Sequence, residues 1–64
     1  MLTKNKLKEF REKLGISQEK LAAEMSVSRQ TIISIETGRY VPSLELSLKF
    51  SKFFKCKVED LFGI

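Results

Sequence analysis

Residues 17–36 constrain the fold of this chain more than any other segment. Their apolar residues recur at intervals of three and four, and the pattern breaks once, at Ser26-Val27. This spacing indicates amphipathic helices, and a serine at a helix start can accept a hydrogen bond from an otherwise unpaired backbone N–H. The sequence therefore predicts two short helices, beginning at Ser17 and Ser28 and joined by a tight turn.

The same spacing predicts three further helices, whereas strand signals are weak because apolar residues do not alternate at a period of two. Gly15 and Gly38 stand where a left-handed residue would end the first and third helices. No linker or repeat divides the 64 residues. We therefore predict an all-α fold, a single compact five-helix domain over residues 1–64. The expected helices are residues 3–14, 17–25, 28 to 36 or 37, 42–54 and 58–62.

Apolar residues mark the inner face expected for each helix on a helical wheel. They are Leu7, Phe10 and Leu14 in the first helix, Leu21, Ala22 and Met25 in the second, Ile32 and Ile35 in the third, and Val58, Leu61 and Phe62 in the last. The fourth helix has Leu44, Leu48 and Phe54 on one side and Leu46, Phe50 and Phe53 on the next. A helix that is apolar over so wide an arc is usually central to its domain or covered by a partner.

Composition argues against several classes of function. One cysteine, no histidine and three isolated glycines leave no metal cluster, no nucleophile–histidine pair and no phosphate-binding loop. We therefore expect no enzyme, no metal and no small-molecule cofactor. No apolar run could span a membrane, and the charged N-terminus does not resemble a signal peptide, so a cytoplasmic location is expected. Cys56 fits a small buried residue better than a redox switch.

The third predicted helix has a mostly polar outer face. Arg29 and Gln30 lie on it, while Ile32 and Ile35 point the opposite way. Arg can make two hydrogen bonds to guanine and Gln can make two to adenine, so this face could read DNA bases. The net charge of +4 suits a polyanion, although solubility alone would also explain it.

Other residues are placed to contact the DNA backbone. Gln18 and Ser28 begin helices, where backbone N–H groups attract phosphates, and Arg39 and Tyr40 follow the third helix. Ser28 also fits a simple cap, and Tyr40 could instead cover the core. The predicted backbone contacts are Gln18, Ser28, Thr37, Arg39 and Tyr40.

Five segments resemble, in order and spacing, the Cro/phage-repressor type of helix-turn-helix domain, the XRE family. They are LGISQEKLA at 14–22, VSRQTI at 27–32, IETGR at 35–39, PSL at 42–44 and VEDLF at 58–62. The resemblance implies a lambda-repressor-like fold that binds a two-fold symmetric operator as a dimer. It also implies that Gln18 contacts the backbone, that Arg29, Gln30, Ile33 and Ser34 read bases, and that Arg11 pairs with Glu36.

Three residues depart from the family pattern. Ser26 stands where Gly or Asn is usual, and a left-handed serine costs on the order of 1 kcal/mol. Lys57 replaces the usual cap of the last helix, so we expect that helix to fray. Ile33 replaces a commonly polar residue, and it fits either a thymine methyl contact or a tolerated exposed isoleucine.

The leading hypothesis is a sequence-specific transcriptional regulator, a repressor, that binds double-stranded DNA as a homodimer. The candidates for the dimer contact are Leu46, Phe50, Phe53, Phe62 and Ile64, with intramolecular core as the alternative for the aromatic residues. An antitoxin-like protein-binding module that also binds DNA is the second hypothesis, although no segment follows Ile64 to wrap a toxin. RNA binding is disfavoured because no aromatic platform interleaves with the basic residues.

Overall fold

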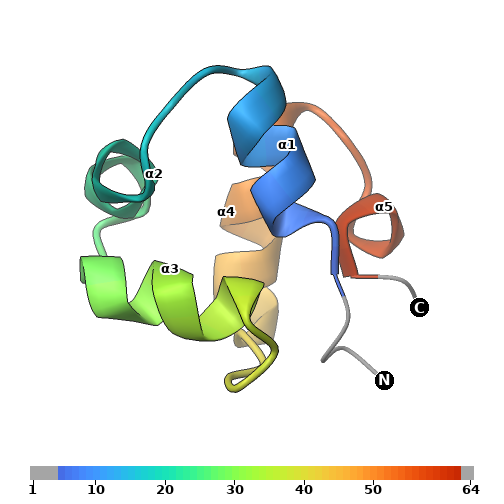
Figure 1. Cartoon of the computed structure of the whole chain (residues 1–64). Helices are drawn as coiled ribbons and strands as arrows, with labels where there is room; N and C mark the ends of the chain where they lie inside the picture. Colours follow the sequence, from blue (N-terminus) through green and yellow to red (C-terminus); the bar gives the residue numbers. More distant parts are fainter. Residues whose placement is uncertain (1–4, 63–64) are drawn as a thin grey trace.

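The computed structural model describes residues 5–62, which form five α-helices and no strand. The helices are α1 (Leu7–Lys13), α2 (Gln18–Met25), α3 (Arg29–Glu36), α4 (Leu44–Phe54) and α5 (Val58–Phe62). Helix α4 lies behind α1, with α2 and α3 on one side of this pair and α5 on the other (Figure 1). The predicted all-α fold is confirmed. No helix of the described part has both the length and the apolar character needed to cross a membrane.

Serine side chains begin three of the helices. The hydroxyls of Ser17, Ser28 and Ser43 each accept a hydrogen bond from the backbone N–H three residues later, at 3.0–3.1 Å. Each bond satisfies one of the N–H groups that a helix start leaves without a partner inside the helix. These caps fix the starts of α2, α3 and α4. The caps at Ser17 and Ser28 were predicted, whereas α4 begins at Leu44, two residues later than the predicted range 42–54, because Ser43 is its cap.

Helix α1 begins later than predicted, at Leu7. Residues 3 and 4 of the expected helix lie outside the described residues. The Asn5 side chain accepts from the Leu7 N–H at 3.1 Å and donates to the Ile35 carbonyl at 2.8 Å. Short polar side chains that bond nearby backbone groups favour positions before a helix over positions inside it, which explains the later start.

Four described residues have a positive φ angle. Gly15 (69°) and Gly38 (79°) do so as predicted, and Ser26 (59°) is left-handed, so the cost given above for a left-handed serine applies to it. Lys55, between α4 and α5, has φ 55° and was not anticipated. Two turns of the fold therefore carry a side chain in a conformation that glycine adopts more easily.

The core draws on all five helices. Its residues, each at most 8% exposed, are Leu7, Leu21, Ala22, Met25, Ile32, Ile35, Leu46, Phe50, Leu61 and Phe62. Helix α4 faces this core with Leu46, Ser47 and Phe50, while Leu44 (73% exposed) and Leu48 (46%) remain outside. The prediction that Leu14 joins the apolar stripe of α1 is wrong, because Leu14 lies beyond the helix and is 53% exposed.

The predicted dimer contact needs correction. Leu46, Phe50 and Phe62 are buried in the core of the single chain, and Phe53 packs against that core. Leu46, Phe50 and Phe62 therefore have almost no surface to offer a second copy, and the alternative of intramolecular core holds for the two aromatic residues among them. Phe53 is only partly buried, so its part in a dimer stays a prediction. Ile64 lies outside the described residues.

Helix α5 spans Val58–Phe62, as predicted. Lys57 supplies no side-chain cap, but its backbone N–H donates to a carboxylate oxygen of Asp60 at 3.0 Å. A carboxylate at a helix start also interacts favourably with the helix dipole. Asp60 thus opposes the fraying that Lys57 led us to expect.

Candidate nucleic-acid interface

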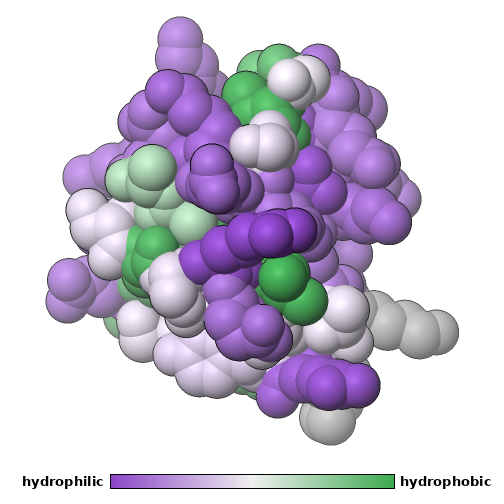
Figure 2. Space-filling model, turned by 60° about the vertical axis from the view of Figure 1, so that its left-hand side comes forward, coloured by the Kyte–Doolittle hydropathy of each residue, from purple (hydrophilic) through white to green (hydrophobic). Residues whose placement is uncertain are grey.

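Helix α3 presents a polar face and anchors the opposite face in the core. Ile32 and Ile35 are fully buried, whereas Arg29 and Gln30 are exposed in the first turn. Ile33, which lies between them on the helical wheel, is half-buried. The side of the molecule formed by α2 and α3 is largely hydrophilic, with apolar atoms in small separate patches (Figure 2).

Two predicted base-reading residues contact each other along α3. The Gln30 Nε2 atom donates to the Ser34 hydroxyl at 3.4 Å. This long contact leaves the Gln30 carbonyl oxygen and its second N–H unused by Ser34, so the amide retains one acceptor and one donor for an adenine edge.

Three helices meet at the Glu36 carboxylate. Arg11 Nε donates to Glu36 Oε2 at 2.7 Å, and Arg11 Nη2 approaches Oε1 at 3.4 Å. The side chains are only 11% and 3% exposed, so the Arg11–Glu36 pair implied by the family resemblance is present and largely buried. Gln18 Nε2 also donates to Glu36 Oε1, at 3.1 Å. Sequence reasoning missed this Gln18 contact, because no local pattern places the start of α2 beside the end of α3.

An open hollow of about 400 Å³ lies at the start of α2, lined by Arg11, Ser17, Gln18, Glu19 and Arg29. The first backbone N–H groups of a helix favour anions. The hollow therefore brings the expected backbone contact, Gln18, to the same place as Arg29, for which base reading was predicted.

A second, smaller hollow of about 230 Å³ lies on the opposite flank of α3, lined by Ser28, Gln30, Thr31, Ser34 and Tyr40. Ser28 Oγ and Thr31 Oγ1 are 2.9 Å apart there. Tyr40 is 45% exposed and borders this hollow, which favours its predicted role at the surface over the alternative of covering the core.

Two more of the predicted backbone contacts lie at the end of α3. Arg39 is exposed in the loop after the helix, where its backbone N–H donates to the Ser34 carbonyl at 2.9 Å. Thr37 is exposed, but its hydroxyl donates to the Ile33 carbonyl at 2.9 Å. Since phosphate oxygens only accept, Thr37 in this conformation has no hydroxyl proton for them, and its predicted contact is not supported.

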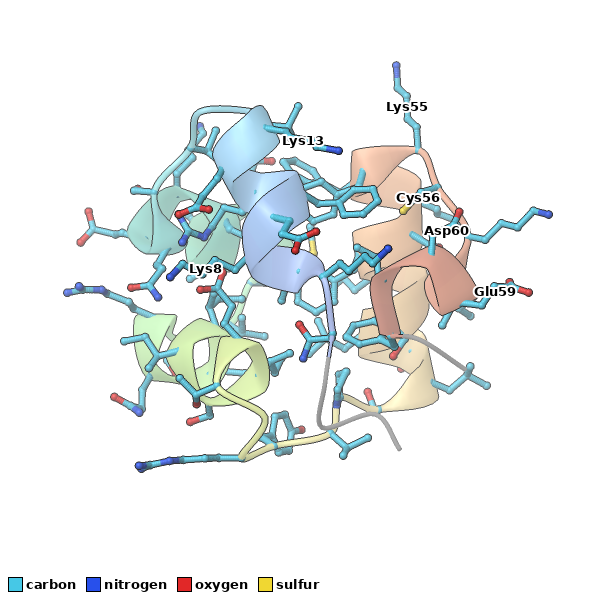
Figure 3. All side chains as sticks on the ribbon, turned by 45° about the vertical axis from the view of Figure 1, so that its right-hand side comes forward. Lys8, Lys13, Lys55, Cys56, Glu59 and Asp60 are labelled. Atoms are coloured by element: carbon cyan, nitrogen blue, oxygen red, sulfur yellow. The ribbon has the colours of Figure 1, made fainter. Side chains whose placement is uncertain are left out.

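Cys56 lies away from this face, between α4 and α5 and beside Asp60 (Figure 3). Burial, and to a lesser extent the negative charge of Asp60, raise the pKa of the Cys56 thiol. The neighbouring Lys55 points away from the sulfur (Figure 3). A raised pKa makes the reactive thiolate scarcer, so the structure favours the packing role of Cys56 over a redox role.

Comparison with known proteins agrees with this geometry. The helix-turn-helix family model matches residues 7–61. The chain is 56% identical over 59 residues to an uncharacterized HTH-type transcriptional regulator of Methanocaldococcus jannaschii. This match covers 92% of this chain and 89% of that protein. It is also 56% identical over 61 residues to the uncharacterized HTH-type transcriptional regulator YgzD of Bacillus subtilis, covering 95% and 92%.

A more distant relative is the HTH-type transcriptional activator BcrR of Enterococcus faecalis, which is 36% identical over 56 residues. That match covers 88% of this chain but only 28% of BcrR. The family match spans all five helices, and the Arg11–Glu36 pair and the exposed start of α3 stand where the resemblance implied. The chain belongs to the XRE type of the helix-turn-helix family of DNA-binding transcriptional regulators.

Proposed function

We propose that this protein is a sequence-specific transcriptional regulator that inserts α3 into the major groove of double-stranded DNA. The observation that carries the proposal is the two-sided character of α3. Ile32 and Ile35 are fixed in the core, while Arg29 and Gln30 project from the exposed first turn. The major groove is about 12 Å wide and admits an α-helix in this orientation.

The two hollows on opposite flanks of α3 support this placement. A helix in the major groove has the phosphates of both strands beside it, one on each flank. Gln18 borders one hollow, and Ser28 and Tyr40 border the other, so these residues are proposed to contact the two backbones. Arg39, exposed after α3, adds a cation for a further phosphate.

Base reading is assigned to the middle of this face. Arg29 is proposed to contact guanine and Gln30 adenine, with Ser34 orienting the Gln30 amide from the next turn. The half-buried Ile33 lies between Arg29 and Gln30 on the helical wheel and is proposed to contact a thymine methyl group.

A homodimer on a palindromic operator is proposed, with the two copies of α3 in major grooves about 34 Å apart. The exposed apolar residues Val41, before α4, and Leu44 and Leu48, one turn apart on α4, are proposed in place of the buried candidates. If the two copies of α4 packed antiparallel, Glu45 near the start of one helix would lie opposite Lys52 near the end of the other, and their charges would attract.

Repression is the proposed outcome because a protein bound to its operator prevents other proteins from binding the same DNA. Binding to the operator needs only the surfaces described above. Selection of bound duplexes from a random DNA pool tests the proposal. We expect a palindromic consensus with half-site centres about 10–10.5 base pairs apart, or a multiple of this spacing. Failure to enrich any sequence, together with an affinity that does not change with salt, would overturn it. With DNA as its ligand, the protein is proposed to act in the cytoplasm.

A further inference from the structure

The Glu36 carboxylate does more than join α1 to α3. Arg11 reaches it with Nε at 2.7 Å, and Arg11 is itself held by a bond from Nη1 to the Ile16 carbonyl at 2.9 Å. The carboxylate is therefore fixed from α1 and from the loop before α2. Gln18 Nε2 then donates to this fixed group at 3.1 Å, although Arg11 alone would hold α1 against α3.

The hydrogen-bonding capacity of the Gln18 amide gives this contact a consequence. A primary amide carries two N–H donors, and Glu36 takes one of them. The second is available to the hollow that Gln18 shares with Ser17 and Arg29. An unrestrained glutamine loses rotamer freedom when it binds a ligand, at a cost of up to about 1.5–2 kcal/mol.

We propose that Glu36 is a positioning residue for DNA binding, which holds the Gln18 amide so that its second N–H meets a backbone phosphate. The proposal rests on the proposed function and deepens it. Arg11 balances the negative charge of Glu36, so the carboxylate can orient Gln18 without strongly repelling the phosphate. Because the contact with Glu36 already restricts the rotamers of Gln18 in the free protein, Gln18 loses less side-chain entropy when it binds the phosphate.

Side-chain order in the free protein tests the first half of the proposal. The chain has two glutamines, Gln18 and Gln30, and Gln30 provides an internal reference because it is exposed and its contact is longer, at 3.4 Å. Nitrogen-15 relaxation of the side-chain amides should show Gln18 more ordered than Gln30. Glu36→Leu, which removes the acceptor, should lower the order of the Gln18 amide and leave that of Gln30 unchanged. Equal order for the two amides in the wild-type protein would overturn the proposal.

A double-mutant cycle tests the second half, using the duplex enriched from the random pool as the probe. Gln18→Ala should weaken binding by about 3–10-fold in the wild-type background. In the Glu36→Leu background, which has no acceptor at this position, the same change should weaken binding about twofold or less, because the Gln18 amide is no longer held. Binding is measured at a temperature where circular dichroism shows every variant folded.

Arg39→Gln provides the matched control. Arg39 is exposed after α3, and within the described residues its side chain has no hydrogen bond or ion pair with Glu36. The loss of DNA affinity caused by Arg39→Gln should therefore be the same in both backgrounds. An equal cost of Gln18→Ala in both backgrounds would overturn the positioning role while leaving the proposed function intact. A wild-type protein that binds no duplex would instead overturn the proposed function.

Gln18→Asn provides a second test that does not depend on whether Glu36→Leu folds. The shorter amide leaves the Arg11–Glu36 pair untouched but cannot reach the carboxylate and a phosphate together. Its affinity should fall as far as that of Gln18→Ala, with no more than a small change in melting temperature. Wild-type affinity in Gln18→Asn would overturn the proposal.

Discussion

Ser26 shows how one residue sets the stability of the helix-turn-helix. Its φ of 59° and ψ of 40° lie in the left-handed region, where the β-carbon costs about 1 kcal/mol relative to glycine. The conformation follows from the turn, since the Ser26 N–H bonds to the Ala23 carbonyl and the Val27 N–H bonds to the Ala22 carbonyl.

Ser26→Gly should therefore raise the melting temperature by about 4–8 °C, the shift that about 1 kcal/mol produces in a domain of this size. Thermal unfolding followed by circular dichroism measures the shift. Ala23→Gly, at an exposed helical position of α2, should lower the melting temperature, because glycine weakens a helix interior. A Ser26→Gly protein no more stable than the wild type would contradict the strain assigned to this turn.

Arg29 and Arg39 should differ in what their loss does to DNA binding. Arg29→Ala should relax preference at one base position, at a cost of about 1–3 kcal/mol on the preferred site. Arg39→Gln should weaken binding on all sequences and reduce the slope of log affinity against log salt by about 0.9. Selection from a random pool and salt titrations on matched duplexes measure both effects. Uniform weakening by Arg29→Ala would show that Arg29 contacts phosphate, as its place beside Gln18 also permits.

At the scale of single elements, much of the fold could be predicted because caps and periodicity are local. Ser17 and Ser28 marked the starts of α2 and α3, and the apolar spacing of residues 58–62 gave α5 its bounds. The core side of α4 could not be predicted, because Leu44 and Leu46 both lie on apolar sides and only packing decides between them. The Gln18–Glu36 contact and the left-handed Lys55 also depend on how helices meet.

The start of α5 couples a helix cap to the chemistry of Cys56. Asp60→Asn should keep an acceptor for the Lys57 N–H but remove the negative charge that raises the pKa of the Cys56 thiol. The pKa should then fall, so at a fixed pH below it more thiolate forms and alkylation is faster. It should stay above its ordinary value, because burial is the larger cause and persists.

The pH dependence of iodoacetamide alkylation measures this shift. Glu59→Gln is the matched control, since Glu59 is on the same helix turn but points away from the sulfur (Figure 3). An alkylation profile that Asp60→Asn leaves unchanged would show that Asp60 does not act on the thiol.

At the scale of the whole molecule, the proposed dimer depends on the exposed side of α4. Leu44→Ser should weaken self-association by about tenfold or more, because burying a leucine contributes about 1.5–3 kcal/mol. Its melting temperature as a monomer should change little, since Leu44 is 73% exposed. Analytical ultracentrifugation measures the association. Leu14→Ser, at a leucine that is 53% exposed but lies after α1, should have no effect, and an equal loss from both variants would contradict the assigned surface.

The first and last described segments of the chain are joined directly, because the Lys6 N–H donates to the Leu61 carbonyl at 2.7 Å. The segment that enters α1 and the segment that forms α5 thus close the domain on the side away from α2 and α3 (Figure 1). Both described ends of the chain thus lie on the side of the domain away from the face that α3 presents (Figure 1). The match that covers 28% of BcrR shows that a domain similar to this one also occurs as part of a longer protein.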